Sequence, residues 1–225
     1  QFLPVAQAKG QIPDSSGMTK SNDQKNLGLI ALVVDNALLN DKTSYRTEGT
    51  SATLTEHIFA YAQNIQNRTP HSLAFVVGID RNESTFKIAS VLEKLYFEGY
   101  DSDFFDNNNL NDDRIPEDDN KLIGVVLVGD VPMPVVTEDD KSTQISLYPY
   151  TDFYQKRYIY NHFTGHYEVN SKVTAPNPDV WHGVIVPPSR EADGRQELAD
   201  YFYKNNQYSI GNPEYAAFSE RMLFA

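Results

Sequence analysis

The sequence predicts an α/β protein in which a mainly parallel sheet lies between layers of helices, as a three-layer sandwich. Three short apolar runs, at residues 27–35, 71–79 and 122–130, are rich in Leu, Ile and Val, as expected of strands buried on both faces. Segments with helical spacing of apolar residues separate these runs. Strands that alternate with helices indicate parallel pairing and right-handed crossovers.

The composition favours a folded, acidic protein. The 225-residue chain is 40% apolar and 22% charged, and its 31 Asp and Glu against 19 Lys and Arg give a formal charge of −12. This material is sufficient to bury a core, and the negative charge argues against a nucleic-acid partner. No apolar run reaches the roughly 18 residues that a membrane span needs.

Two features of the sequence, its lack of cysteine and the nature of its first residues, indicate which chemistry is excluded and where the protein is expected to be located. With no cysteine, the sequence excludes disulfides and a cysteine nucleophile within these residues. The start, QFLPVAQAKG, lacks Met and has no cationic group ahead of its apolar residues, as in a processed chain. We therefore expect an exported protein, extracellular or at the cell surface. Residues 1–26, polar and interrupted by Pro and Gly, are predicted to form an extended leader.

Residues 27–215 are predicted to form one α/β subdomain. In its first half, helix-start and helix-stop signals separate the predicted strands. Thr53 and Glu56 form a capping box at the start of the helical pattern LTEHIFAYAQNIQ. Asp80 and Glu83 give a second capping signal after the second strand. Gly99 is expected to end the helix that follows it.

The pattern changes after the third strand. VPMPVV cannot continue a central strand, because proline lacks the amide hydrogen that the ladder needs. Residues 153–169, rich in Tyr and containing Thr164 and Gly165, predict a β-hairpin. PDVWHGVIVPP, residues 178–188, is predicted to be a further buried strand, and EADGRQELADYFYKNNQY a last helix.

Three stretches of the second half carry a set of motifs. LIGVVLVGDVPMPVV contains Leu-Val-Gly-Asp, YPYTDFYQKRYIYN contains Thr-Asp ahead of the tyrosine-rich segment, and PDVWHGVIVPP begins with Pro-Asp-Val. Together they resemble the gingipain-type cysteine peptidases of the caspase-like clan, and the resemblance covers residues 27–225. The Gly-Arg-Ile-Pro turn of that family appears here as GVIVP, residues 183–187, without the arginine, so no role of that guanidinium is carried over.

The resemblance implies a caspase-like fold and the first, non-catalytic subdomain of an exported gingipain-like cysteine peptidase. In that family the catalytic histidine and cysteine lie downstream, in a second subdomain. Residues 216–225, which end in MLFA, are expected to begin a strand of that missing subdomain. The expected partners are the downstream polypeptide, protein substrates, or a second copy of the chain. No catalytic residue is assigned, and we expect the chain to be inactive alone.

Two alternatives to this function remain open. The first is a catalytically inactive cell-surface interaction or structural module. The second is a metal-dependent phosphoryl-transfer enzyme, since Asp35, Asp80 and Asp130 each end an apolar strand and ligands bind outside such ends in α/β sheets. A helix cap and turn chemistry equally explain Asp80 and Asp130, and no Gly-rich phosphate loop accompanies them.

A calcium site is predicted in the acidic loop of residues 101–121. Asp101 and Asp103, then Asp106 and Asn108, stand two residues apart, and such oxygen-rich spacing suits the irregular coordination of Ca²⁺. The central Gly and terminal Glu of an EF-hand loop are missing. A solvated acidic loop is the alternative interpretation.

Aromatic residues and one histidine complete the candidates. The aromatic group favours a binding face and aromatic pairing across a hairpin equally; it consists of Tyr148, Tyr150, Phe153, Tyr154, Tyr158, Tyr160, Phe163 and Tyr167. His182 precedes Gly183, a pair that caspase-like enzymes use for their general base. The sequence has no thiol and identifies no plausible serine partner for it, and we interpret it as a strand histidine without a catalytic role.

Overall fold

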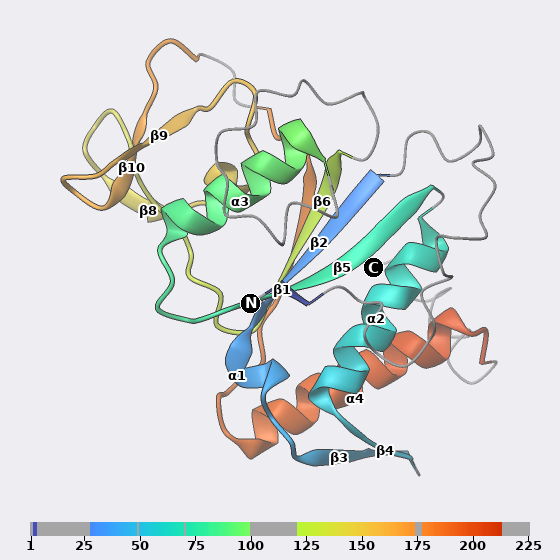
Figure 1. Ribbon diagram of the computed structural model, residues 1–225. Helices are drawn as coiled ribbons and strands as arrows, with labels where there is room; N and C mark the ends of the chain where they lie inside the picture. Colours follow the sequence, from blue (N-terminus) through green and yellow to red (C-terminus); the bar gives the residue numbers. More distant parts are fainter. Residues whose placement is uncertain are drawn as a thin grey trace, which may run out of the picture.

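The structure, a computed structural model, is built on one central sheet with strand order β1-β5-β2-β6-β11. It describes residues 2–3, 28–48, 50–69, 71–99, 121–173 and 177–212. The parallel strands are β2 (Gly28–Asp35), β5 (Ser72–Ile79), β6 (Leu122–Val128) and β11 (Trp181–Ile185). A short strand, β1 (Phe2–Leu3), pairs antiparallel with β5. The predicted α/β class with a mainly parallel central sheet is confirmed (Figure 1).

Strand β2 is the centre of the sheet. It pairs with β5 from Gly28 to Asp35 and with β6 from Leu29 to Val34. All its residues after Gly28 are buried. Alternate side chains of a strand point to opposite faces, so an unbroken apolar run needs cover on both sides.

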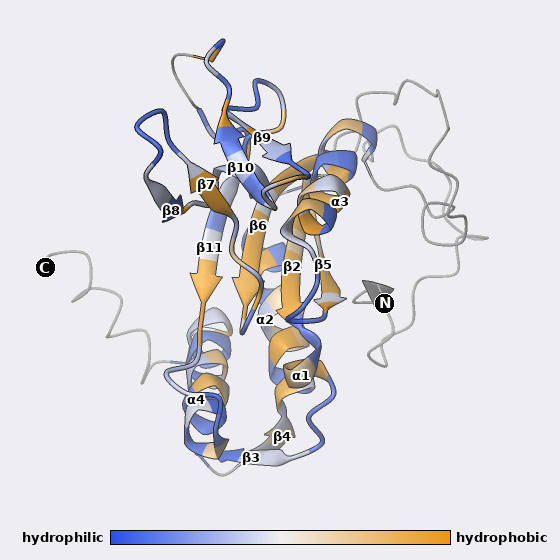
Figure 2. Cartoon of the chain, turned by 90° about the vertical axis from the view of Figure 1, so that its left-hand side faces the viewer, coloured by the Kyte–Doolittle hydropathy of each residue, from blue (hydrophilic) through white to orange (hydrophobic). Residues whose placement is uncertain are grey.

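Helices provide that cover on both faces of the sheet (Figure 2). On one face, α3 (Thr85–Glu98) buries Ile88 and Leu92 against the strands. On the other, α2 (Leu54–Arg68) and α4 (Ala192–Ser209) pack side by side, with the short α1 (Asn36–Leu39) at their end. The two cores are separated by the sheet itself.

Smaller sheets fill the connections. The chain between β6 and β11 forms a four-stranded sheet that packs on the α3 side, where Val136 and Tyr167 join the core. Its strands, in the order β8-β7-β10-β9, are Thr143–Ile145, Val135–Thr137, His166–Val169 and Tyr158–Asn161. The 3₁₀ helix η4 (Tyr148–Tyr150) lies between β8 and β9, and β3 (Ser44–Thr47) pairs antiparallel with β4 (Thr50–Thr53).

The first predicted capping box is confirmed and the second is wrong. The Thr53 amide donates to the Glu56 carboxylate at 2.7 Å, and the Glu56 amide donates to the Thr53 hydroxyl at 3.3 Å. Helix α3 instead begins at Thr85, with Ser84 as its N-cap. Asp80 lies too far ahead of this start to cap the helix, and its carboxylate accepts a hydrogen bond from Asn36. Gly99 follows the end of α3 with φ of 71°, a conformation that glycine adopts readily.

The strand predicted at residues 178–188 exists as β11, but its predicted burial is wrong. Trp181, Val184 and Val186 are 44%, 42% and 55% exposed. The reason is position: β11 pairs only with β6 in the described part of the chain, so one of its edges is open. Apart from residues 2–3, the predicted leader lies outside the described residues, as does the strand predicted at residues 216–225. No described helix is long and apolar enough to cross a bilayer.

The contact between α2 and α4 combines aromatic packing with buried polar groups. Phe202 is 1% exposed, and its ring centroid lies 5.1 Å from that of Tyr61. One turn of α2 away, His57 is buried, and its Nε2 has no hydrogen-bond partner in the described structure. Desolvation lowers the pKa of His57, although the carboxylates of Glu56 and Asp200 oppose that effect.

Replacing Phe202 with alanine should destabilise the fold strongly. The change leaves a cavity between α2, α4 and the sheet, and such substitutions cost about 3 to 5 kcal/mol. Phe163→Ala is the matched control, because Phe163 is fully exposed and surface changes stay within about 0.5 kcal/mol. Urea unfolding of both variants measures the difference, and equal stabilities would contradict the packing described.

His57 should make the protein less stable in mild acid. Because its folded pKa lies below the unfolded value of about 6.5, the unfolded state takes up the proton first, and stability falls as the pH drops through that value. The free energy of unfolding of His57→Gln should therefore decrease less than that of the wild type between about pH 7.5 and about pH 5.5. His182→Gln, at an exposed position, should retain the wild-type pH dependence.

Candidate functional site

The carboxyl ends of the parallel strands form the first candidate site. The chain leaves β2 toward β5 on one side and returns from β5 across β2 to β6, so the strand order switches between β2 and β6. Ligands of open α/β sheets bind outside the strand ends at such a switch. Asp35 ends β2 and Asp130 follows β6, as the sequence pattern predicted.

Arginines occupy the space between these carboxylates. Arg81 lies 3.1 Å from a carboxylate oxygen of Asp35 and 3.8 Å from one of Asp130, and Arg190 lies 2.6 Å from the same Asp130 oxygen. We call Asp35, Arg81, Asp130 and Arg190 the strand-end network. The Asp35 side chain is only 4% exposed and also accepts a hydrogen bond from the Ala37 amide at the start of α1. Sequence reasoning missed both arginines.

Asp80 does not join the other two aspartates. Its carboxylate accepts from Asn36 Nδ2 at 2.9 Å, whereas Arg81 holds the carboxylates of Asp35 and Asp130. Among the described residues there is no group of three or more His, Cys, Asp or Glu side chains arranged to hold a metal ion. The calcium ligands predicted in the acidic loop, Asp101, Asp103, Asp106 and Asn108, lie outside the described residues.

Gly129 allows the sheet and α1 to approach at this end. It has φ of 83°, and a Cβ there would lie 2.6 Å from Leu38 Cδ1. Its amide donates to Ile185 O, which ties the end of β6 to the end of β11. The glycine of the Leu-Val-Gly-Asp motif therefore serves close packing at the switch, and the aspartate that follows serves the strand-end network.

The Thr-Asp and Pro-Asp motifs form a second polar centre at the opposite end of β11. Asp179 accepts from the amides of Phe153 and Tyr154 at 2.7 and 2.8 Å, and its own amide donates to Thr151 O. Asp152, 5% exposed, accepts hydrogen bonds from the amides of Lys156 and Arg157. We call the hydrogen bonds of Asp152 and Asp179 together the motif clamp. The clamp joins the start of β11 to the loop before β9.

The predicted aromatic group is divided between core and surface. Tyr150, Phe153 and Tyr167 are less than 5% exposed, whereas Tyr154 and Phe163 are 75% and 100% exposed. Tyr158 and Tyr160, together with the buried Phe153 and Tyr167, line an open groove of about 240 Å³ between α3 and β9. Its rings contact one another: Phe86, Tyr160 and His162 lie pairwise at 4.9 to 5.0 Å.

Burial has a clear electrostatic effect on the groove. Desolvation, together with a 2.6 Å hydrogen bond to Glu138, raises the pKa of Tyr158 to about 12. Desolvation likewise raises the pKa of Tyr167. These hydroxyls are thus neutral hydrogen-bonding groups at physiological pH. Because the aromatic rings of the groove pack against one another, they serve to attach β9 to α3, and this structural role accounts for the groove without a ligand.

The open edge and outer faces of β11 form the third candidate site. His182 and Val184 point to the α3 side of the sheet, since they pair with Val125 and Leu127 of that core. Both are exposed, because neither α3 nor the small sheet reaches over them. On the other face Trp181 packs over Gly124, where a Cβ would lie 2.1 Å from the indole. The chain has no cysteine to pair with His182.

Comparison of the chain with protein-family models, curated proteins and solved structures finds no match.

Removing the Arg81 guanidinium should expose how strongly the strand-end network depends on charge pairing. Arg81→Met leaves the buried Asp35 carboxylate short of a partner, which should cost about 1 to 3 kcal/mol. Adding Asp35→Asn should recover part of that loss, because asparagine keeps the cap on α1 without the charge. Arg190→Met, at a side chain 68% exposed, should cost less than about 1 kcal/mol. A double variant no more stable than Arg81→Met would refute the pairing.

Proposed function

We propose that the chain is the non-catalytic first subdomain of an exported gingipain-like cysteine peptidase, with a caspase-like fold, and that it supports a catalytic half and its substrate cleft. The observation that carries the proposal is the open edge of β11. The central sheet has four parallel strands in the order β5-β2-β6-β11, and it stops at a strand that is apolar and exposed. Among the described residues nothing pairs with the outer side of β11, and such an exposed apolar edge can pair with a further polypeptide.

The exposure at β11 has an energetic consequence. Val184 lies in β11 and Val186 follows it, yet both side chains are about half exposed. Fully burying such a side chain is worth roughly 1.5 to 3 kcal/mol. A strand added beside β11 would also form hydrogen bonds with the outward-facing backbone N–H and C=O groups of β11. These groups need such partners once another layer of polypeptide buries them. Both gains favour a partner that extends the sheet.

The motif residues support the same proposal. The motif clamp fixes β11 against the loop before β9, and the strand-end network ties Arg190, just after β11, to Asp130 after β6. Both ends of the open strand are therefore held rigidly. The antiparallel pairing of β9 with β10 supports the tyrosine-rich hairpin of the proposed fold. Rigid presentation of an edge is what a supporting subdomain needs.

The alternative of an inactive interaction module uses the same edge. It is favoured by one observation on His182, which lies in a His-Gly pair like that of a peptidase base: the sequence holds no cysteine beside which it could act, and its side chain makes no hydrogen bond among the described residues that would orient it as a base. In the phosphoryl-transfer alternative Asp35 and Asp130 would bind a metal, but both already contact Arg81. No observation supports that alternative further.

Co-expression with the polypeptide encoded downstream in the same reading frame tests the proposal. The two parts should copurify, and backbone amides of residues 181–185 should become protected from hydrogen exchange. Peptidase activity should require both parts and disappear on thiol alkylation, because only the downstream part supplies a thiolate. This chain alone should show no such activity.

Matched variants locate the contact. Val184→Asp should weaken copurification by placing a charge in the new interface. Ile145→Asp, a comparable change at a residue 68% exposed on the edge strand β8, should have no effect. Absence of a downstream polypeptide, or copurification without thiol-dependent activity, would replace the peptidase proposal with the interaction module.

A further inference from the structure

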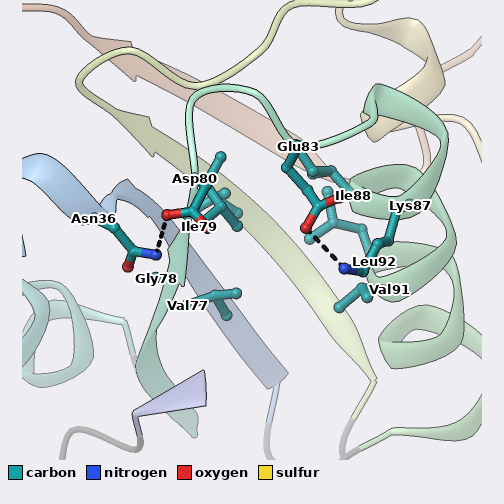
Figure 3. Close-up of a pocket in the computed structure, with 11 residues that line it drawn as sticks. Asn36, Val77, Gly78, Ile79, Asp80, Glu83, Lys87, Ile88, Val91 and Leu92 are labelled. Carbon is teal, nitrogen blue, oxygen red and sulfur yellow. Dashed lines mark hydrogen bonds and ion pairs between the residues drawn. The ribbon is translucent and has the colours of Figure 1, made fainter. Parts of the chain in front are cut away.

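An apolar pocket lies between α3 and the carboxyl end of β5 (Figure 3). Its volume is about 90 Å³, roughly three times the 30 Å³ that one water molecule occupies in the liquid. Aliphatic side chains of the core form its interior, and these are Val33, Val77, Ile79, Ile88, Val91 and Leu92. Because close-packed cores leave few spaces of this size, the pocket is a feature to be explained.

The size of the pocket limits the group that it can hold. A dry apolar cavity of about 150 Å³ binds benzene, which has six carbons. By that measure a volume of about 90 Å³ suits a compact hydrocarbon group of about four carbons. The branched side chain of leucine is such a group. Water fits this space poorly, because aliphatic walls offer it no hydrogen-bond partner.

Polar side chains border the pocket, and their charges are not fully compensated. Asn36 donates to the Asp80 carboxylate at 2.9 Å, and Lys87 donates to the Glu83 carboxylate at 2.7 Å, as Figure 3 shows. Lys87 and Glu83 thus neutralise each other, whereas Asp80 receives a neutral amide. The neighbouring Arg81 contacts the carboxylates of the strand-end network instead. Within the described part of the chain, no cation pairs with Asp80.

The pocket adjoins a wider polar hollow at the same end of the sheet. This open hollow has a volume of about 440 Å³ and shares Asn36, Asp80 and Glu83 with the pocket. Asn40 and Asn82 also line it. The side-chain amide of asparagine both donates and accepts hydrogen bonds. It therefore matches the N–H and C=O groups of a peptide backbone.

We propose that the pocket and the hollow form a binding site for the amino terminus of a peptide whose first residue is leucine or an aliphatic residue of similar size. The first side chain fills the apolar pocket, and the terminal ammonium group pairs with Asp80 at the rim. The peptide groups that follow lie in the polar hollow. Capture of an amino-terminal amine is a recurring mode of peptide recognition, and hydrogen bonds between charged groups are stronger than neutral ones.

This peptide site does not depend on the proposed function. None of the residues that line the pocket or the hollow belongs to β11. The site therefore holds whether β11 recruits a peptidase half or another partner. Its consequence is a second place for polypeptide to bind, at the carboxyl end of β5.

Titration of the full chain with the tripeptide amide Leu-Gly-Gly tests the site. At about millimolar peptide, an affinity within reach of so small a ligand, the methyl resonances of Ile79 and Ile88 should shift. That of Ile58, on the opposite face of the sheet, should not. Three matched probes each lack one part of the ligand: the N-acetylated tripeptide lacks the charge, Gly-Gly-Gly amide lacks the side chain, and leucinamide lacks the following peptide groups. Each should bind at least about tenfold more weakly.

A matched pair of variants locates the ammonium group. Asp80→Asn should weaken binding of the tripeptide at least about tenfold, because asparagine keeps the shape of the side chain but not its charge. Asp139→Asn, at an exposed position between β7 and β8, should bind as the wild type does. Absence of methyl shifts in the wild-type protein would overturn the proposal, as would equal binding of the acetylated tripeptide. Leucinamide that binds as tightly as the tripeptide would overturn the assignment of a peptide ligand.

Discussion

The complete burial of β2 is the constraint on which the rest of the structure depends. A strand that hydrogen-bonds to a neighbour on each side and presents Leu, Ile and Val to both faces cannot meet water anywhere along its length. Helices must therefore cover both faces, so α3 lies on one side and α2 with α4 on the other. The crossovers that place them there bring the carboxyl ends of β2 and β6 together, where Arg81 contacts both Asp35 and Asp130 and Arg190 contacts Asp130.

The two edges of the central sheet, at β5 and at β11, differ in how they are covered. Two residues of β1 pair with the outer edge of β5, whereas no described residue pairs with the outer side of β11, where Val184 and the following Val186 are about half exposed. The aromatic contacts between α3 and β9 add rigidity on one face without reaching β11, so they leave His182 and Val184 available.

The sequence identified what is local and strongly patterned. The apolar runs match β2, β5 and β6 within two residues at their ends, and the capping box of Thr53 and Glu56 is present as predicted. It could not show that β11 lies at an edge, because an apolar run looks the same whether one neighbour or two will pair with it. Nor could it reveal that Arg81 bridges Asp35 and Asp130, since the three residues meet only after two crossovers have formed. The strands of the small sheets, three or four residues long, are too short for a period to emerge.

The motifs that carry the resemblance act mainly in folding. The glycine of Leu-Val-Gly-Asp permits close packing against α1, and the aspartates of Thr-Asp and Pro-Asp bind backbone amides of the loop before β9. A carboxylate that accepts two backbone hydrogen bonds is costly to replace, because its loss leaves those amides unpaired. Such residues would be retained by any protein that needs this loop and this strand in fixed positions. Under the proposed function, these motifs would fix the framework around β11, and the chemistry of a peptidase would come from the residues that a partner brings to that edge.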